Sequence, residues 1–156
     1  MTHRVSTPVL VTILISVAAL CGQDGQKDLD KLQGTWTVTA AEERGKPLPK
    51  EITEKMTVTF KGDKMVIDGP MAVAKGEEPA KPEFNVKLDP SKKPKALDVT
   101  PLSGKFKGKT ALGIYQMEGD ELMICLPNQK QKDRPTEFKS PEGSDLFLIT
   151  LKKAKN

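Results

Sequence analysis

Hydrophobic and polar residues alternate with a period of two along most of the chain after residue 34. The first such segment, residues 35–40 (TWTVTA), has Trp36, Val38 and Ala40 on one face and three threonines on the other. Successive side chains of a β-strand point to opposite faces, so this pattern predicts a half-buried strand. The same alternation recurs over residues 56–60, 65–67, 84–88 and 97–99.

Short turn sequences join several of these segments into predicted hairpins. Gly62, between residues 56–60 and 65–67, supplies the positive φ that a tight turn requires. The strongest hairpin spans residues 110–126 and turns at residues 118–121, and a last strand covers residues 146–151. With a short extended piece at residues 134–138, the count is eight or nine short strands, joined mostly as nearest neighbours.

Little helix is expected. Residues 28–33 form one helical turn capped by Asp28, residues 51–55 form a second, and residues 22–27 are a flexible polar lead-in. The loops cover residues 42–50 and 68–82. The predicted fold class is therefore all-β, either an antiparallel sandwich or an up-and-down barrel of about eight strands, and the barrel is favoured because it leaves no exposed strand edges.

The inward faces of these strands carry mostly large side chains, so we expect a packed core or a modest apolar pocket. The strand that carries Ile114 and Tyr115 is apolar on both faces, and its register is not assigned. The residues predicted to point inward are Trp36, Val38, Met56, Val58, Phe60, Met65, Ile67, Phe84, Val86, Leu88, Leu97, Val99, Leu122, Ile124, Leu126, Phe147, Ile149 and Leu151.

The N-terminus has the pattern of a secretory signal. Residues 1–4 carry one arginine, and residues 9–20 are apolar, a stretch too short to cross a bilayer as a helix. We expect a signal peptide over residues 1–21, cleaved between residues 19 and 23, and one domain over residues 28–153. The protein is then exported, periplasmic or secreted. The alternative is a lipoprotein anchored through Cys21.

The rare residues exclude many chemistries. The only histidine, His3, lies within the predicted leader, so the domain lacks the imidazole of histidine-ligated zinc sites and of Ser-His-Asp and Cys-His nucleophiles. Cys125 lies in an apolar strand and is interpreted as a buried hydrophobe. We therefore predict no enzyme activity, catalytic residue, metal or cofactor. A hydrolase that uses carboxylates alone is a minor alternative.

The charge balance is mildly basic and comes mostly from lysine. The formal net charge is +4. The nearest candidate for a nucleic-acid contact is residues 105–109 (KFKGK), which we interpret as solvated lysines on a strand edge or hairpin. No nucleic-acid partner is expected, and a membrane is expected only if Cys21 is lipidated. The oligomeric state is left open.

Residues 32–36 (LQGTW), after a helical turn and at the start of the first strand, resemble the Gly-x-Trp entry of lipocalins, in which the Trp usually packs under an Arg or Lys. Later lipocalin motifs are not evident: there is no Thr-Asp-Tyr segment, and the last strand ends in Lys152 and Lys153. A family of secreted lipocalin-like domains from planctomycete bacteria is more similar. The matching segments are residues 32–36, 88–95 (LDPSKKPK), 113–120 (GIYQMEGD) and 134–138 (RPTEF). The resemblance implies an exported lipocalin-like barrel without an established activity.

These observations together predict a non-enzymatic binding protein at the cell envelope, with a small apolar or amphipathic ligand in the barrel mouth. The alternative is a packed barrel that serves as a structural or protein-interaction module, through the face of Ile114 and Tyr115 or through residues 69–82. We also expect Arg134 to stack on Trp36, or else to be a surface residue that holds a loop. The predicted ligand-binding residues are Trp36, Phe60, Phe84, Tyr115 and Arg134.

Overall fold

The computed structural model describes residues 20–70, 81–128 and 133–155. Most of the predicted signal peptide, and most of the loop at 69–82, lie outside these residues. No helix in the described part of the chain is both long enough and apolar enough to span a membrane.

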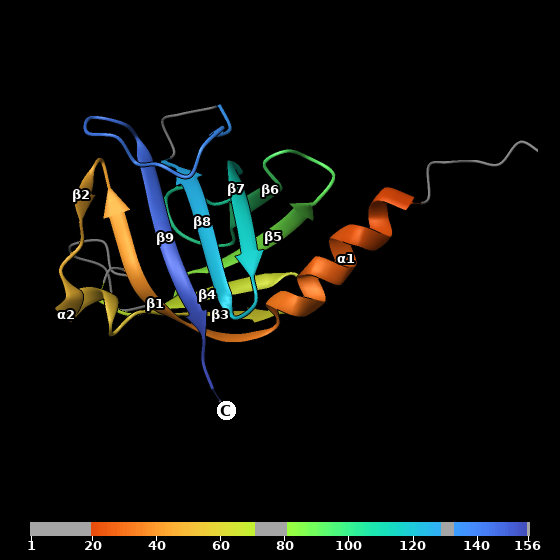
Figure 1. Ribbon diagram of the computed structural model, residues 1–156, viewed down its shortest axis with the longest axis horizontal. Coiled ribbons are helices and arrows are strands. Elements are labelled where there is room, and N and C mark those ends of the chain that lie inside the picture. Colours follow the sequence, from red (N-terminus) through yellow and green to blue (C-terminus); the bar gives the residue numbers. More distant parts are fainter. Residues whose placement is uncertain (1–19, 71–80, 129–132, 156) are drawn as a thin grey trace, which may run out of the picture.

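The strands form one antiparallel sheet that closes into an eight-stranded up-and-down barrel (Figure 1). Each strand pairs with its neighbour in sequence, and the first strand also pairs with the last, so the predicted fold class is confirmed. The barrel strands are β1 (Gly34–Glu43), β3 (Thr57–Lys61), β4 (Lys64–Asp68), β5 (Glu83–Asp89), β6 (Ala96–Pro101), β7 (Ala111–Glu118), β8 (Glu121–Pro127) and β9 (Leu146–Lys153).

The predicted hairpins are present. Gly62 has a φ of 62° in the β3–β4 turn, and Glu118 pairs with Glu121 across the β7–β8 turn. Two details differ from expectation. Residues 134–138 are not a strand, and the two-residue strand β2 (Lys46–Pro47) lies in the expected loop at 42–50 and pairs with the end of β1.

Alternate connections of an up-and-down barrel lie at the same end. The short connections at residues 62–63, 90–95 and 119–120 therefore share the end at which β1 begins, which we call the helix end. The connections at residues 44–56 and 102–110 lie at the opposite end, the loop end.

A helix lies beside the barrel at the helix end. This helix, α1 (Leu20–Leu32), runs alongside β5 (Figure 1). Residues 22–27, predicted to be a flexible lead-in, belong to it, so that prediction is wrong. Its contact with the barrel explains the difference, because an amphipathic helix is stabilised mainly by packing. The second helical turn, α2 (Lys50–Thr53), matches its prediction.

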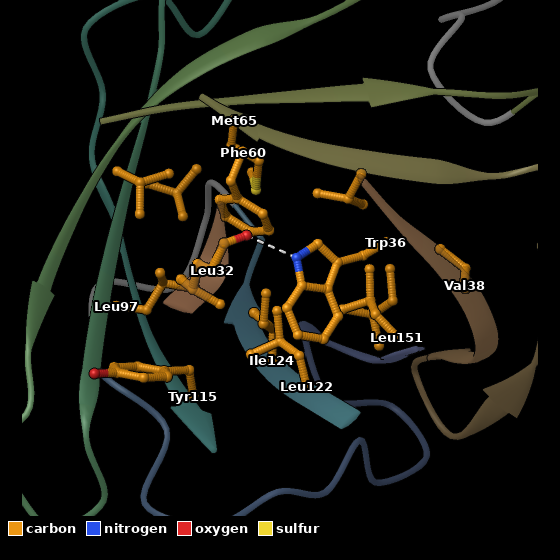
Figure 2. Close-up of a cluster of buried hydrophobic side chains, with 14 of the residues drawn as sticks. Leu32, Trp36, Val38, Phe60, Met65, Leu97, Tyr115, Leu122, Ile124 and Leu151 are labelled. Carbon is orange, nitrogen blue, oxygen red and sulfur yellow. Dashed lines mark hydrogen bonds between the residues drawn. The ribbon is translucent and has the colours of Figure 1, made fainter. Parts of the chain in front are cut away.

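The barrel interior is filled by side chains (Figure 2). All the residues named above as pointing inward belong to the buried core or pack against it. Ala40, predicted to share the face of Trp36 and Val38, is exposed, because the register of β1 against β9 shifts between Val38 and Ala40 and buries Ala41 instead. The core also contains residues that the alternation did not single out: Leu32 of α1, Ala41 and Tyr115 are buried in it, and Leu48, Ile52 and Met117 pack against it.

The structure shows which residues of strand β7 point into the barrel. Tyr115 belongs to the buried core, whereas its neighbour Ile114 points to the outside of the barrel and is nevertheless fully buried. Gly113 shares the inward parity of Tyr115, and a Cβ there would lie 2.5 Å from the Leu126 side chain. The space that a side chain would need at Gly113 is thus occupied by Leu126.

The outward face of β7 and β8 is covered by residues 133–145, which we call the strap. Cys125, opposite Ile114 in the sheet, is fully buried, and its thiol donates to the Lys139 carbonyl of the strap at 3.6 Å. Pro135 and Ser140 of the strap are buried. The face of Ile114 and Tyr115 is therefore not free to bind a partner, which removes one of the two contact surfaces of the packed-barrel alternative.

Candidate functional site

The predicted ligand-binding residues do not form one site. Trp36, Phe60 and Tyr115 are buried in the core, with side chains at most 2% exposed, and Figure 2 shows all three among the packed aliphatic residues. Phe84 is half-buried and packs against the same core. Arg134 lies in the strap, on the outside of the barrel.

The side chain above Trp36 is a lysine from the last strand. Lys153 Nζ lies 5.4 Å from the centre of the Trp36 ring and donates to the Lys31 carbonyl at 2.9 Å, while Trp36 Nε1 donates to the Leu32 carbonyl at 2.7 Å. A cation over an indole face is stabilising by about 0.5–2 kcal/mol. These contacts join α1, β1 and β9, so Trp36 has a structural role.

Arg134 is engaged elsewhere. Its guanidinium donates to the Gly113 carbonyl and, at 2.7 Å, to the Asp98 carboxylate. The expectation that Arg134 stacks on Trp36 is wrong, and the other interpretation, an arginine that holds a loop, describes its contacts. It fixes the strap to β6 and β7.

Larger hollows lie on the outside of the core. Four clefts of about 310–470 Å³ are formed by the described residues, and none of the four is lined by Trp36, Phe60 or Phe84. One, of about 430 Å³, lies between α1 and β5 on Leu29, Val86 and Leu88, and its lining contains one charge of each sign, on Lys87 and Asp89. The others lie beside β2, on the polar face of β5 and β6, and beside β7.

The cleft beside β7 combines apolar surface with an excess of positive charge, and we call it the lysine cleft. Its volume is about 310 Å³. Strand β7 and the strap supply part of its apolar lining, and the β5–β6 connection supplies two prolines and all of its lysines. It is lined by Pro90, Lys92, Lys93, Pro94, Lys95, Tyr115, Gln116, Met117, Glu118 and Phe138.

Local hydrogen bonds set the course of the β5–β6 connection. The Asp89 carboxylate accepts from the Ser91 amide at 3.1 Å and from the Ser91 hydroxyl, the arrangement of an Asx turn. These bonds from Ser91 lower the pKa of Asp89, and the charge of Lys92 lowers it further. Pro90 and Pro94 restrict the backbone on both sides of the lysines.

A buried carboxylate holds the third lysine. Asp28 of α1 is 6% exposed, and its Oδ2 accepts from Lys95 Nζ and from the Tyr115 hydroxyl, each at 2.7 Å. Burial alone would raise the pKa of Asp28, but the hydrogen bonds from Lys95 and Tyr115 and the charges of Lys95 and Lys31 outweigh it and lower the pKa. Asp28 is therefore charged at neutral pH.

Tyr115 is correspondingly a permanent donor. Burial raises the pKa of its phenol well above the ordinary value, and the hydrogen bond to Asp28 and the charges of Asp28 and Asp89 raise it further. A phenol that stays protonated serves to position α1 and does not act as a base.

Lys92 and Lys93 remain available to a ligand. Both are exposed, and neither forms an ion pair within the described part of the chain, where the charge of Lys95 is balanced by Asp28. Glu118 is the one carboxylate that lines the lysine cleft. The described residues contain no group of three His, Cys, Asp or Glu side chains that could hold a metal ion.

Sequence reasoning missed most of this site. From the sequence, the lysines of the β5–β6 connection were interpreted as solvated surface residues, and Asp28 was interpreted as a helix cap. Lys95 is 67 positions from Asp28, and Tyr115 is 87 positions from it, so no local pattern connects them. Tyr115 is the one predicted ligand-binding residue that lines the cleft.

Comparison with known proteins adds no relative: no family model, no curated protein and no solved structure matches the chain.

Proposed function

We propose that the protein is an exported, non-enzymatic, lipocalin-like binding protein whose ligand is a small amphipathic anion held in the lysine cleft. The observation that carries the proposal is the combination of Lys92 and Lys93, unpaired within the described residues, with an aromatic and aliphatic lining. Small-molecule sites are concave and mostly apolar, with a few polar groups that orient the ligand.

The filled interior argues for an external site. The inward-facing residues that a ligand in the barrel mouth would contact are packed against one another, with Trp36 and Phe60 at most 2% exposed. In the lysine cleft, by contrast, an apolar ligand body would lie against Met117 and Phe138, which are partly exposed, while its anionic group faces the ammonium groups. The Asp28 carboxylate does not oppose such a ligand, because Lys95 neutralises it.

The test uses two fluorescent probes of nearly equal shape. The dye 8-anilinonaphthalene-1-sulfonate carries one negative charge, and N-phenyl-1-naphthylamine is its uncharged counterpart. We expect saturable binding of the sulfonate, with the uncharged dye weaker. Replacing Lys92 and Lys93 by glutamate should weaken the sulfonate by at least about tenfold, which corresponds to about 1.4 kcal/mol.

A matched control reverses two lysines outside the cleft. Lys61 and Lys64 flank the β3–β4 turn and are exposed, so Lys61→Glu with Lys64→Glu makes the same change in net charge. This variant should bind the sulfonate nearly as the wild type does. Equal weakening of sulfonate binding in both variants would mean that net charge alone, and not the lysine cleft, causes the loss.

Native mass spectrometry of protein isolated from its own cell envelope would identify the natural ligand. A bound mass that is lost on denaturation and that belongs to an amphipathic anion is the expected result. Failure of the sulfonate to bind, together with a clean unliganded mass, would contradict the proposal. The packed barrel without a small-molecule ligand, which the filled core favours, would then be the better description.

A further inference from the structure

The β6–β7 connection presents an aromatic side chain to solvent among lysines. Phe106 is 39% exposed and is the exposed large hydrophobic residue of the described part of the chain. Lys105 Nζ and Lys109 Nζ each lie 5.9 Å from the centre of its ring. Lys107 lies between them in sequence and is exposed too.

The backbone of this connection is folded into turns. Lys107 N donates to the Gly104 carbonyl at 3.2 Å, and Lys109 N donates to the Phe106 carbonyl at 3.0 Å. Gly108 N donates to the Pro101 carbonyl at 2.9 Å, which closes the connection at its base. Gly104 and Gly108 both have a φ of 77°, a conformation that glycine adopts without strain. Phe106 is thus held in place before any partner arrives.

The local charge is of one sign. No aspartate or glutamate occurs in the sequence between Asp98 and Glu118. Within the described residues, none of the three lysines of the connection forms an ion pair. The lysines are exposed on the connection of the β6–β7 hairpin, in agreement with the expected solvated lysines, and two of them, Lys105 and Lys109, lie beside an exposed ring.

We propose that the β6–β7 connection docks on an anionic lipid surface, with the Phe106 ring in the interfacial region and Lys105, Lys107 and Lys109 at the lipid phosphates. An aromatic ring and ammonium groups together match such a surface, which is apolar below and negatively charged at the headgroups. Each lysine near an anionic bilayer strengthens binding by about fivefold. This contact would not require acylation of Cys21.

The topology separates this contact from the proposed ligand site. The β6–β7 connection lies at the loop end of the barrel, and the β5–β6 connection, which carries the lysines of the cleft, lies at the helix end. A molecule docked through Phe106 keeps the lysine cleft away from the bilayer. The two proposals can therefore fail independently.

The test is vesicle co-sedimentation of the purified protein. One set of vesicles contains equal parts of phosphatidylglycerol and phosphatidylcholine, and the other contains phosphatidylcholine alone. Affinities for the two sets are compared within each variant, so that any contribution of the apolar residues 9–20 cancels. We expect a preference for the anionic vesicles that weakens as salt is added.

Three variants assign the preference to the β6–β7 connection. Replacing Lys105, Lys107 and Lys109 by glutamate should abolish it, a loss of about a hundredfold or more. Phe106→Ser should reduce binding to anionic vesicles about tenfold. The control reverses Lys61, Lys64 and Lys155, three exposed lysines outside the connection, and should keep most of the preference.

Insertion of the ring is measured separately. The variant Phe106→Trp has two tryptophans, the buried Trp36 and an exposed indole at position 106. In anionic vesicles, the emission of the indole at position 106 should shift to the blue and be quenched by brominated lipids. Three outcomes would overturn the proposal: no preference for anionic vesicles, equal loss in the control, or no quenching of the new indole. Binding of a single-stranded oligonucleotide without vesicle binding would assign the surface to nucleic acid instead.

Discussion

Asp28 shows at the scale of one residue how a buried charge is kept in this protein. Two donors from different elements, Lys95 of the β5–β6 connection and Tyr115 of β7, share one of its oxygens, and Lys31 Nζ lies 3.6 Å from the other. The carboxylate thereby fixes α1 to the barrel. Hydrogen bonds to a charged group contribute more to stability than those between neutral groups.

We predict that Asp28→Asn lowers the free energy of unfolding by about 1–3 kcal/mol at neutral pH, because the amide loses the charge that Lys95 and Tyr115 contact. Urea unfolding followed by the fluorescence of Trp36 measures this. Asp24→Asn is the control, since Asp24 is exposed and its ion pair with Lys27 is exposed too.

The stability of the wild type and that of Asp28→Asn should also respond differently to acid. The folded state lowers the pKa of Asp28, so the stabilisation is present above the ordinary aspartate pKa of about 4 and is lost as the pH falls through the lower folded value. The difference between wild type and Asp28→Asn should therefore shrink in acid. A difference that stays constant with pH would show that Asp28 acts through shape alone.

Residue-level contacts were the least predictable from sequence. The lipocalin resemblance implies an Arg or Lys beside Trp36. The candidate from the sequence was Arg134, with a loop-holding role as its alternative. Register decides the matter: Trp36 pairs with Lys153 where β1 meets β9, and the short-range pattern contains no information about strand partners so far apart.

At the scale of elements, the strap explains why β7 is apolar on both faces. Residues 133–145 cover Ile114 and Cys125 on the outside of the sheet, and Arg134 holds the strap to Gly113 and Asp98. A strand that is buried on one face by the core and on the other by a loop loses the alternation that identifies a half-buried strand.

We predict that Arg134→Ala destabilises the protein by about 1–3 kcal/mol and speeds the reaction of Cys125 with iodoacetamide in the folded state. Burial raises the pKa of the Cys125 thiol, so in the wild type it should react slowly. Mass spectrometry of a Cys21→Ser background follows one thiol. Lys139→Ala, which removes an exposed ion pair of the same strap, should change neither quantity.

Most strands were predictable because one face lies on the core and the other in solvent, unlike β7 and β8 beneath the strap. The helix α1 was not, since its polar and glycine-containing residues 22–27 favour a loop when taken alone. Its contact with β5 is close: a Cβ on Gly25 would lie 3.0 Å from the Leu88 carbonyl oxygen. Tertiary packing of this kind overrides local propensity.

At the scale of the whole molecule, stability and the charges proposed for binding reside in different residues. The core inside the barrel determines the fold, and the lysines of both proposed contact surfaces belong to connections outside it, although Tyr115 and Met117 serve the core and also line the lysine cleft. We predict that Phe60→Ala lowers the free energy of unfolding by about 3–5 kcal/mol through the cavity it leaves. In conditions where the variant remains folded, its affinity for the sulfonate probe should be unchanged.

The reverse should hold for Lys92→Glu with Lys93→Glu, which should keep wild-type stability and lose the probe. Thermal unfolding and probe titration on both variants check this separation. If Phe60→Ala alone abolished probe binding, the ligand would have to enter the barrel interior.

The barrel closes only when β1 pairs with β9, its last strand. The edge of β1 that faces away from β3 pairs with residues 147–153 of β9, so this edge and the outer edge of β8 stay open until β9 has been synthesised. Contacts this distant in sequence form slowly and leave edges exposed in the meantime. A chain that stops before β9 therefore has two unpaired edges along a hydrophobic face, and aggregation through these edges is the expected fate of any truncated product.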